Sequence, residues 1–105
     1  MECLNKVELI GTVGNVRISE VSDSTLVKFA VATNYCYKSK DGCAVIETTW
    51  HYCSAWTCNL PNAAELAKGS KVHLFGRIRT NNYIGVDGVE RTAIEILVNK
   101  LDIIG

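Results

Sequence analysis

β-branched and aromatic residues dominate this chain from end to end, and only one short segment has the features of a helix. Strand-like apolar patterns, separated by turn residues, occupy residues 4–13, 26–34, 46–58, 71–80 and 91–104. The first strand should bend at Gly11 and Gly14, because glycine within a strand commonly marks a bulge or a bend. With 105 residues the chain has the length of a single domain, and the pattern predicts that this domain is all-β.

The one helical segment lies between the third and fourth predicted strands. Pro61 near its first turn and Gly69 just past its last turn predict a short helix there. Three strands, a short helix and two further strands is the order of the OB-fold, a five-stranded Greek-key barrel. An SH3-like barrel is the main alternative, but it does not usually carry a helix at this position. The sequence therefore favours one OB-fold domain over residues 1–105.

Composition narrows the functional classes. Eleven basic and eleven acidic residues give a net charge of zero, which counts mildly against a nucleic-acid protein that works by bulk attraction. Hydrophobic residues make up 48% of the chain, which favours a spare apolar surface, most simply used as a subunit interface. Five cysteines, with no signal peptide and no apolar run long enough to span a membrane, predict reduced thiols and a cytoplasmic location.

The third predicted strand carries the most informative pattern. Side-chain alternation places Trp50, Tyr52 and Trp56 on one face, and His51 and Cys53 on the other. Aromatic rings are what unpaired bases need, since stacking contributes about 1–3 kcal/mol per base with little sequence preference. Aromatic stripes are usually core, however, so this strand alone leaves core packing and base stacking equally open.

Basic side chains near the aromatic ones favour binding. Arg77 and Arg79 share a face of the fourth strand and cannot both be buried without partners, so this face should be exposed. Two hairpins add further aromatic and basic groups, namely Tyr35, Tyr37, Lys38 and Lys40 in the first and Tyr83 and Arg91 in the second. Basic groups interleaved with aromatic rings form a positive groove with stacking platforms, which suits a single strand. Ordinary solvated hairpins are the alternative.

Catalytic and metal-binding patterns are weak. His51 and His73 have no nucleophile and orienting carboxylate that can be argued from spacing. His51, Cys53 and Cys58 are possible zinc ligands, but the paired CxxC-like spacing typical of zinc sites is missing. We therefore expect no catalytic residue, no metal and no cofactor.

Several segments of the chain, including those with the aromatic and basic residues described above, resemble the bacterial single-stranded DNA-binding protein family (SSB). The matching segments follow the family's order at residues 5–11, 30–34, 49–51, 68–70, 76–80, 87–91 and 95–96. The most specific are the pair Trp50-His51 and the run Gly76-Arg77-Ile78-Arg79-Thr80. The resemblance implies a non-enzymatic protein that binds and protects single-stranded DNA with little sequence preference during replication, recombination and repair. The stacking free energy of about 1–3 kcal/mol per base given above is a general value for single-strand-binding proteins, including members of this family.

The resemblance also assigns roles to individual residues. The family's four base-stacking positions correspond to Tyr37, Trp50, Trp56 and Tyr83, and basic positions correspond to Arg79, Lys6 and Arg17. Val7 and Leu9 of the first strand, together with His51, fall where family members pair subunits, which implies strand-paired dimers, usually assembled into a homotetramer. The full predicted DNA-binding set is Tyr37, Trp50, Tyr52, Trp56, Tyr83, Lys38, Lys40, Arg77, Arg79 and Arg91.

The chain departs from the family pattern at several points. Tyr52 stands where the family usually has arginine, so stacking is expected to replace one backbone contact. The loop after Gly14 is shorter than usual, which weakens the case for Arg17, and the return of the first hairpin over residues 42–46 is more apolar. The sequence stops at Gly105, whereas SSB usually continues into a flexible tail with an acidic tip. We therefore expect a tail-less variant or a trimmed chain, with no recruitment of partners through a tail.

Two other functions remain open. A tail-less OB-fold subunit of a primosome or replication complex would act mainly through protein contacts, and the neutral total charge favours it somewhat. An RNA-binding domain of the cold-shock type is disfavoured by the motif match, although only contact with a 2′-hydroxyl separates RNA from DNA. The expected location is the bacterial cytosol or nucleoid, with a phage or mobile element as another possible source of the gene.

Overall fold

All five predicted strands form, and they close into a barrel in the order β1-β2-β3-β5-β4. In the computed structural model, which describes residues 2–105, the strands are β1 (Val7–Val21), β2 (Ser24–Lys38), β3 (Ala44–Trp56), β4 (Lys71–Ile84) and β5 (Glu90–Ile103). β3 and β5 pair in parallel, and the other neighbours are antiparallel. This order, with a short helix between β3 and β4, is that of the OB-fold, so the fold prediction is confirmed.

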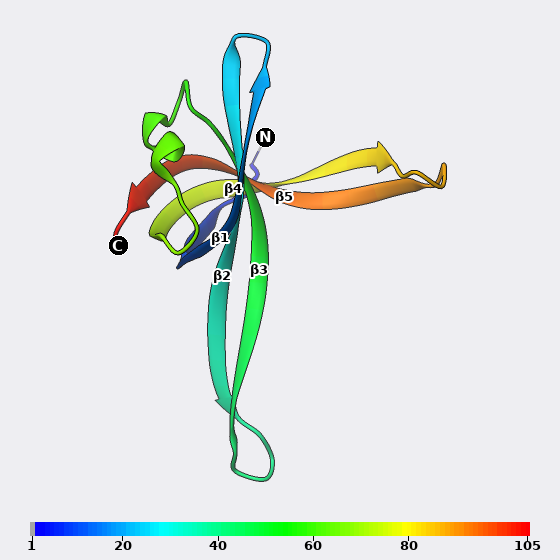
Figure 1. The fold of residues 1–105 in the computed structure, drawn as a ribbon. Helices are drawn as coiled ribbons and strands as arrows, with labels where there is room; N and C mark the ends of the chain where they lie inside the picture. The colour runs from blue at the N-terminus through cyan, green and yellow to red at the C-terminus, as the bar shows by residue number, and fades with distance from the viewer. Residues whose placement is uncertain (1) are drawn as a thin grey trace.

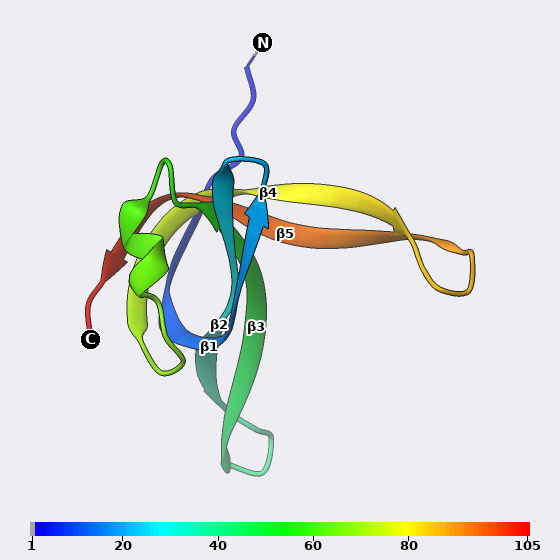
Figure 2. The same ribbon diagram turned by 45° about the horizontal axis from the view of Figure 1, so that its top comes forward.

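The strands extend beyond the barrel as three projecting hairpins (Figure 1). The β1–β2, β2–β3 and β4–β5 hairpins point in different directions, and the second view shows the same separation (Figure 2). We predicted that the second and fourth strands end near Asn34 and Thr80, but their ladders continue to Lys38 and Ile84. Two strands of a hairpin satisfy each other's backbone hydrogen bonds outside the core, where apolar alternation is not needed. The sequence pattern therefore stops before the strands do.

The core is one apolar cluster inside the barrel. Its largest fully buried side chains are Val13, Val27, Val31, Val72 and Leu74. Cys53 and Ala55 of β3 are also buried, as expected for small side chains inside a narrow barrel. Within residues 2–105, no helix is long and apolar enough to cross a membrane.

β4 leaves the barrel after an irregularity in its pairing with β5. The register shifts between Phe75 and Gly76, and the ladder continues outward from there. Ile78, which alternation places on the same face as the buried Leu74, is 46% exposed. On this one face of β4, residues inside the barrel are therefore buried, and residues beyond the end of the barrel are exposed.

The predicted helix is shorter than expected. It is a 3-10 helix over Pro61–Glu65 that starts at the predicted proline but ends well before Gly69. No side chain caps its first turn, and the backbone at Leu66 is already extended. A 3-10 helix rarely runs longer because its hydrogen-bond geometry is poor. Burial of Ala63 and Leu66 in the core cluster holds the segment on the barrel.

Truncation of the core should be costly. Leu74→Ala removes a side chain with 0% exposure, and we expect it to lower the free energy of unfolding by about 2–5 kcal/mol. Ile18→Ala, at a position that is 60% exposed, should change it by less than about 0.5 kcal/mol. Urea unfolding at matched protein concentration measures both. A Leu74→Ala cost as small as that of Ile18→Ala would contradict the core described here.

Candidate nucleic-acid interface

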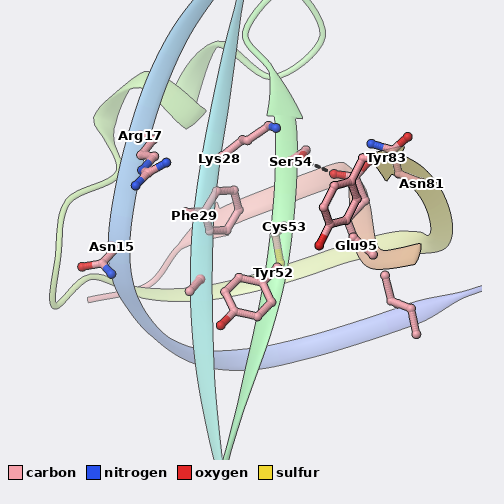
Figure 3. Close-up of a pocket in the computed structure, with 13 residues that line it drawn as sticks. Asn15, Arg17, Lys28, Phe29, Tyr52, Cys53, Ser54, Asn81, Tyr83 and Glu95 are labelled. Atoms are coloured by element: carbon pink, nitrogen blue, oxygen red, sulfur yellow. Dashed lines mark hydrogen bonds between the residues drawn. The ribbon is translucent and has the colours of Figure 1, made fainter. Parts of the chain in front are cut away.

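A hollow of about 570 Å³ crosses the barrel wall from β1 to β4, and we call it the groove (Figure 3). All five strands contribute polar, aromatic or charged side chains to it. These are Asn15 and Arg17 from β1, Lys28 from β2, Tyr52 and Ser54 from β3, Glu95 from β5, and Asn81 and Tyr83 from β4. The groove therefore combines aromatic rings and cations in one concave surface.

Two aromatic residues of the groove, Tyr52 and Tyr83, and the adjacent Trp50 of β3 are exposed, whereas Phe29, which also lines the groove, is buried in the core. Tyr52 is 65% exposed, Trp50 51% and Tyr83 48%, so the alternative that the β3 stripe packs in the core is wrong for Trp50 and Tyr52. Trp56 lies at the end of β3, in register with Leu26 of β2, and is half-buried. Exposed aromatic rings on a rigid sheet can accept the flat face of a base.

Trp50 lies over Gly14 of β1. A Cβ atom at Gly14 would come within 2.6 Å of the Cζ3 atom of the Trp50 ring. Gly14 falls in the irregular stretch of β1 between Val13 and Val16, so the predicted bend at this glycine is confirmed. The lack of a side chain at this position lets the indole approach the backbone of β1, a consequence that the sequence pattern did not reveal.

A second, more apolar hollow of about 380 Å³ lies at the barrel end next to Trp50. Its walls are Val7, Leu9, Trp50, His51, Tyr52, Ile78, Ile94 and Ile96. Val7, Leu9 and His51, the three predicted interface residues, are therefore brought together by the fold. All three are half-buried, and His51 Nε2 lies 2.8 Å from Thr33 Oγ1.

Tyr37 lies away from the other predicted stacking residues. It pairs with Val45 on the β2–β3 hairpin, whereas Trp50 pairs with Ala32. Because paired residues share a face and faces alternate, Tyr37 is on the opposite face of this hairpin from Trp50. Its nearest aromatic contact is Tyr35, with 6.1 Å between ring centroids.

Three of the predicted basic residues are free of carboxylate partners. Across residues 2–105, Lys38, Lys40 and Arg77 form no salt bridge, and all three are exposed. Lys38 and Lys40 lie at the tip of the β2–β3 hairpin rather than in the groove. Lys6 lies outside the groove with its ammonium 5.8 Å from the ring centre of Phe75.

Arg79 is held by Glu95, its cross-strand partner. The Arg79 Nη2 and Nε groups donate to Glu95 Oε1 over 2.7 and 3.0 Å, and Ser54 Oγ donates to Glu95 Oε2 over 2.9 Å. The sequence predicts Arg79 as a DNA-binding residue and does not reveal this carboxylate partner, because strand register cannot be read from a single strand. Its charge is largely balanced in the folded protein.

Arg91 is also paired, at the tip of the β4–β5 hairpin. Its Nη2 group donates to Asp87 Oδ2 over 2.6 Å. Hydrogen bonds from the Val89 N–H and from Arg91 hold the pKa of Asp87 below its ordinary value. The Asp87-Gly88 turn predicted from the sequence is therefore stabilised by the same arginine that was predicted to bind DNA.

Arg17 and Lys28 are the basic residues that line the groove. They face each other across the β1–β2 ladder. The short loop after Gly14 weakened the case for Arg17, and Lys28 was absent from the predicted set. The sequence does contain a sign that Lys28 is on the surface. It lies between Val27 and Phe29, whose side chains are buried, so alternation along β2 places Lys28 on the outer face of the strand.

The histidines and thiols form no metal-ligand cluster in the part of the chain that the structure describes. His73 Nε2 lies 2.6 Å from Glu8 Oε2, apart from the groove. Burial raises the pKa of the Cys53 thiol to about 12, which keeps it protonated and unreactive at neutral pH. Within residues 2–105, no three His, Cys, Asp or Glu side chains converge as metal ligands would.

Comparison with known proteins decides the family. Residues 4–104 match the Single-strand binding protein family. This chain belongs to that family. Two single-stranded DNA-binding proteins illustrate the relationship: that of Neisseria meningitidis is 37% identical over 97% of this chain and 60% of its own length, and that of Xanthomonas axonopodis is 31% identical over 97% and 58%. The chain thus spans about three fifths of the length of these relatives, and the family resemblance noted from the sequence is confirmed.

Solved structures agree with the barrel. The Plasmodium falciparum SSB complex with ssDNA superposes with a TM-score of 0.84 at 25% identity, covering 99% of this chain and 96% of that one. A deletion mutant of the single-stranded DNA binding protein from Thermus aquaticus superposes at 0.80, over 97% of this chain and 51% of that one. At 17% identity the second likeness supports the fold alone.

The contact between Trp50 and Gly14 can be tested in the free protein. In a Trp56→Phe background, Trp50 is the only tryptophan, and Gly14→Ala should push its ring off β1 into water. We therefore expect the fluorescence emission of Trp50 to shift to longer wavelength. The matched control places Gly14→Ala in a Trp50→Phe background, where the emission of Trp56 should stay unchanged. Equal spectra with and without Gly14→Ala in the first background would show that the indole does not lie on this glycine.

Proposed function

We propose that this chain binds single-stranded DNA with little sequence preference and acts by binding, without catalysis. The observation that carries the proposal is the groove, whose lining includes the exposed rings of Tyr52 and Tyr83 and the cations Arg17 and Lys28. Membership of the Single-strand binding protein family and the likeness to an SSB–ssDNA complex support it. A bound strand is thereby kept from nucleases and from reannealing, which serves replication, recombination and repair.

Stacking and charge have separate roles in this proposal. Bases stack on Tyr52 and Tyr83 in the groove, and then on Trp50 next to it. Phosphates bind the cations Arg17 and Lys28. Outside the groove, we propose that Trp56, Tyr37, Lys38, Lys40 and Arg77 extend the DNA-binding surface along the strands and the β2–β3 hairpin.

An assembly subunit that acts mainly through protein contacts is the second candidate. It is favoured by the net charge of zero and by the ion pairs of Arg79 and Arg91, which reduce the cations free for phosphates. Such a protein would keep its partner and show no affinity for single-stranded DNA. The two functions therefore differ in a direct binding measurement.

The binding test is a titration with oligo-dT, oligo-rU and duplex DNA at two salt concentrations, followed by tryptophan fluorescence. Trp50 and Trp56 are the only tryptophans, so the signal comes from the proposed surface. We expect quenching by oligo-dT, little effect of duplex DNA and weaker binding at high salt. Tyr52→Ala should weaken oligo-dT binding about 5- to 150-fold, the equivalent of about 1–3 kcal/mol for one stacked base.

Ile84→Ala, at a position that is 75% exposed on β4, is the matched control and should leave the affinity unchanged. Absence of binding, in both fluorescence and the anisotropy of labelled oligo-dT, would reject the proposal and favour the assembly subunit. Equal affinity for oligo-rU would show that the groove does not distinguish the sugar 2′-position.

We propose further that the chain forms a homo-oligomer of strand-paired dimers, most simply a tetramer. Residues 7–11 of β1 pair with β4 on one edge, and among the described residues 2–105 no strand covers their other edge. Ile10 in this segment is 61% exposed. An uncovered edge with an apolar side chain is a template for pairing with another chain, and a second copy gives a closed two-fold pair.

Sedimentation velocity tests this assembly. Ile10→Lys adds a charge at the open edge and should shift the protein towards smaller species. Ile84→Lys adds the same charge at an exposed position far along the β4–β5 hairpin and should leave the assembly unchanged. A monomeric wild-type protein at micromolar concentration, or equal assembly of all three proteins, would reject strand pairing at this edge.

We propose that the protein works in a reducing compartment, on the basis of its cysteines. All five cysteines are free, which supports a reducing environment such as the bacterial cytosol or nucleoid.

A further inference from the structure

The two walls of the groove differ in charge. A row of side chains follows the pairing of the strands around the barrel: Arg17 on β1, Lys28 on β2, Ser54 on β3, Glu95 on β5 and Arg79 on β4. Figure 3 shows Arg17 and Lys28 on one side of β3, and Glu95 and Tyr83 on the other. The cations of the first wall form no salt bridge within residues 2–105.

The second wall presents a carboxylate instead of a cation. Glu95 lines the groove, whereas Arg79 does not. The Glu95 side chain is only 16% exposed, compared with 47% for Arg79, and Ser54 holds its second oxygen. Hydrogen bonds between two charged groups are about twice as strong as neutral ones, so this arrangement fixes Glu95 in place.

A phosphate on this wall would meet opposing effects. Any attraction to Arg79 is offset by repulsion from Glu95, which lies only 2.7 Å from the guanidinium. Drawing Arg79 away would leave the Glu95 carboxylate, whose side chain is only 16% exposed, with Ser54 as its one remaining hydrogen-bond partner among residues 2–105. A partly buried charge that loses its ion-pair partner is unfavourable. Arg79 is therefore poorly placed to neutralise a phosphate.

We propose that Glu95 is a positioning residue that withdraws Arg79 from the phosphates and thereby sets the path of the DNA backbone. The backbone runs along the wall of Arg17 and Lys28, and the bases point across β3 towards Tyr52 and Tyr83. This inference rests on the proposed binding of single-stranded DNA. It removes Arg79 from the phosphate contacts that the family resemblance implied.

The salt dependence of oligo-dT binding tests the proposal, because each phosphate contact to a single strand contributes about 0.7 to the slope of log K against log salt. Removing both charges in R79Q/E95Q should leave the slope at its wild-type value. E95Q alone frees Arg79 and should steepen the slope by about 0.7. The matched control K28Q/E65Q also keeps the net charge, since Glu65 is an exposed residue of the 3-10 helix, and should flatten the slope by about 0.7.

A slope that flattens in R79Q/E95Q as it does in K28Q/E65Q would overturn the proposal, since Arg79 would then contact a phosphate in the wild-type protein. An unchanged slope in E95Q would overturn it as well. Thermal unfolding of each variant checks the fold. If the E95Q variants do not fold, R79Q alone decides the question: its slope should equal that of the wild type, and a loss of about 0.7 would contradict the inference. Failure of the wild-type protein to bind oligo-dT would instead reject the proposed function itself.

Discussion

The whole structure depends on the change of partner that β1 makes halfway along its length. Its first half pairs with β4 and its second half with β2, and Thr12 is paired with both Lys71 and Ala32. This change closes the barrel. It requires a very close approach at Gly11, where a Cβ atom would clash with the carbonyl oxygen of Ala32. A larger residue would force the strands apart, and the groove, which draws side chains from every strand, would lose its shape.

The same strand connects the fold to the proposed function in two further ways. Its irregular stretch around Gly14 makes room for the ring of Trp50, and its uncovered edge over residues 7–11 is the place where a second copy is proposed to pair. The adjacent hollow contains Val7, Leu9 and His51. Closure of the barrel, the position of the Trp50 ring and the proposed pairing with a second copy thus all involve the same strand.

A neutral protein can bind a polyanion when its charges are unevenly placed. Here Arg79 and Arg91 are balanced by Glu95 and Asp87, while Arg17 and Lys28 are left unbalanced in the groove. What matters for a phosphate is the local potential at the point of contact, and total charge says little about it. This is why the net charge of zero does not argue strongly against a DNA-binding protein.

The sequence by itself determined the order of elements along the chain, the all-β class and the common face of the β3 aromatic residues, because these follow from the period of two along each strand and from the turn residues between strands. That this face is exposed was decided by the tertiary structure. Trp50 and Tyr52 could be placed on a common face without any knowledge of their neighbours. Only the tertiary structure decided that Arg79 meets Glu95, that Lys28 faces Arg17 and that Tyr37 lies on the opposite face of its hairpin from Trp50. These facts depend on the register between strands and on where each strand leaves the barrel. Register is set by contacts between segments distant in sequence, so it leaves no mark in the local pattern.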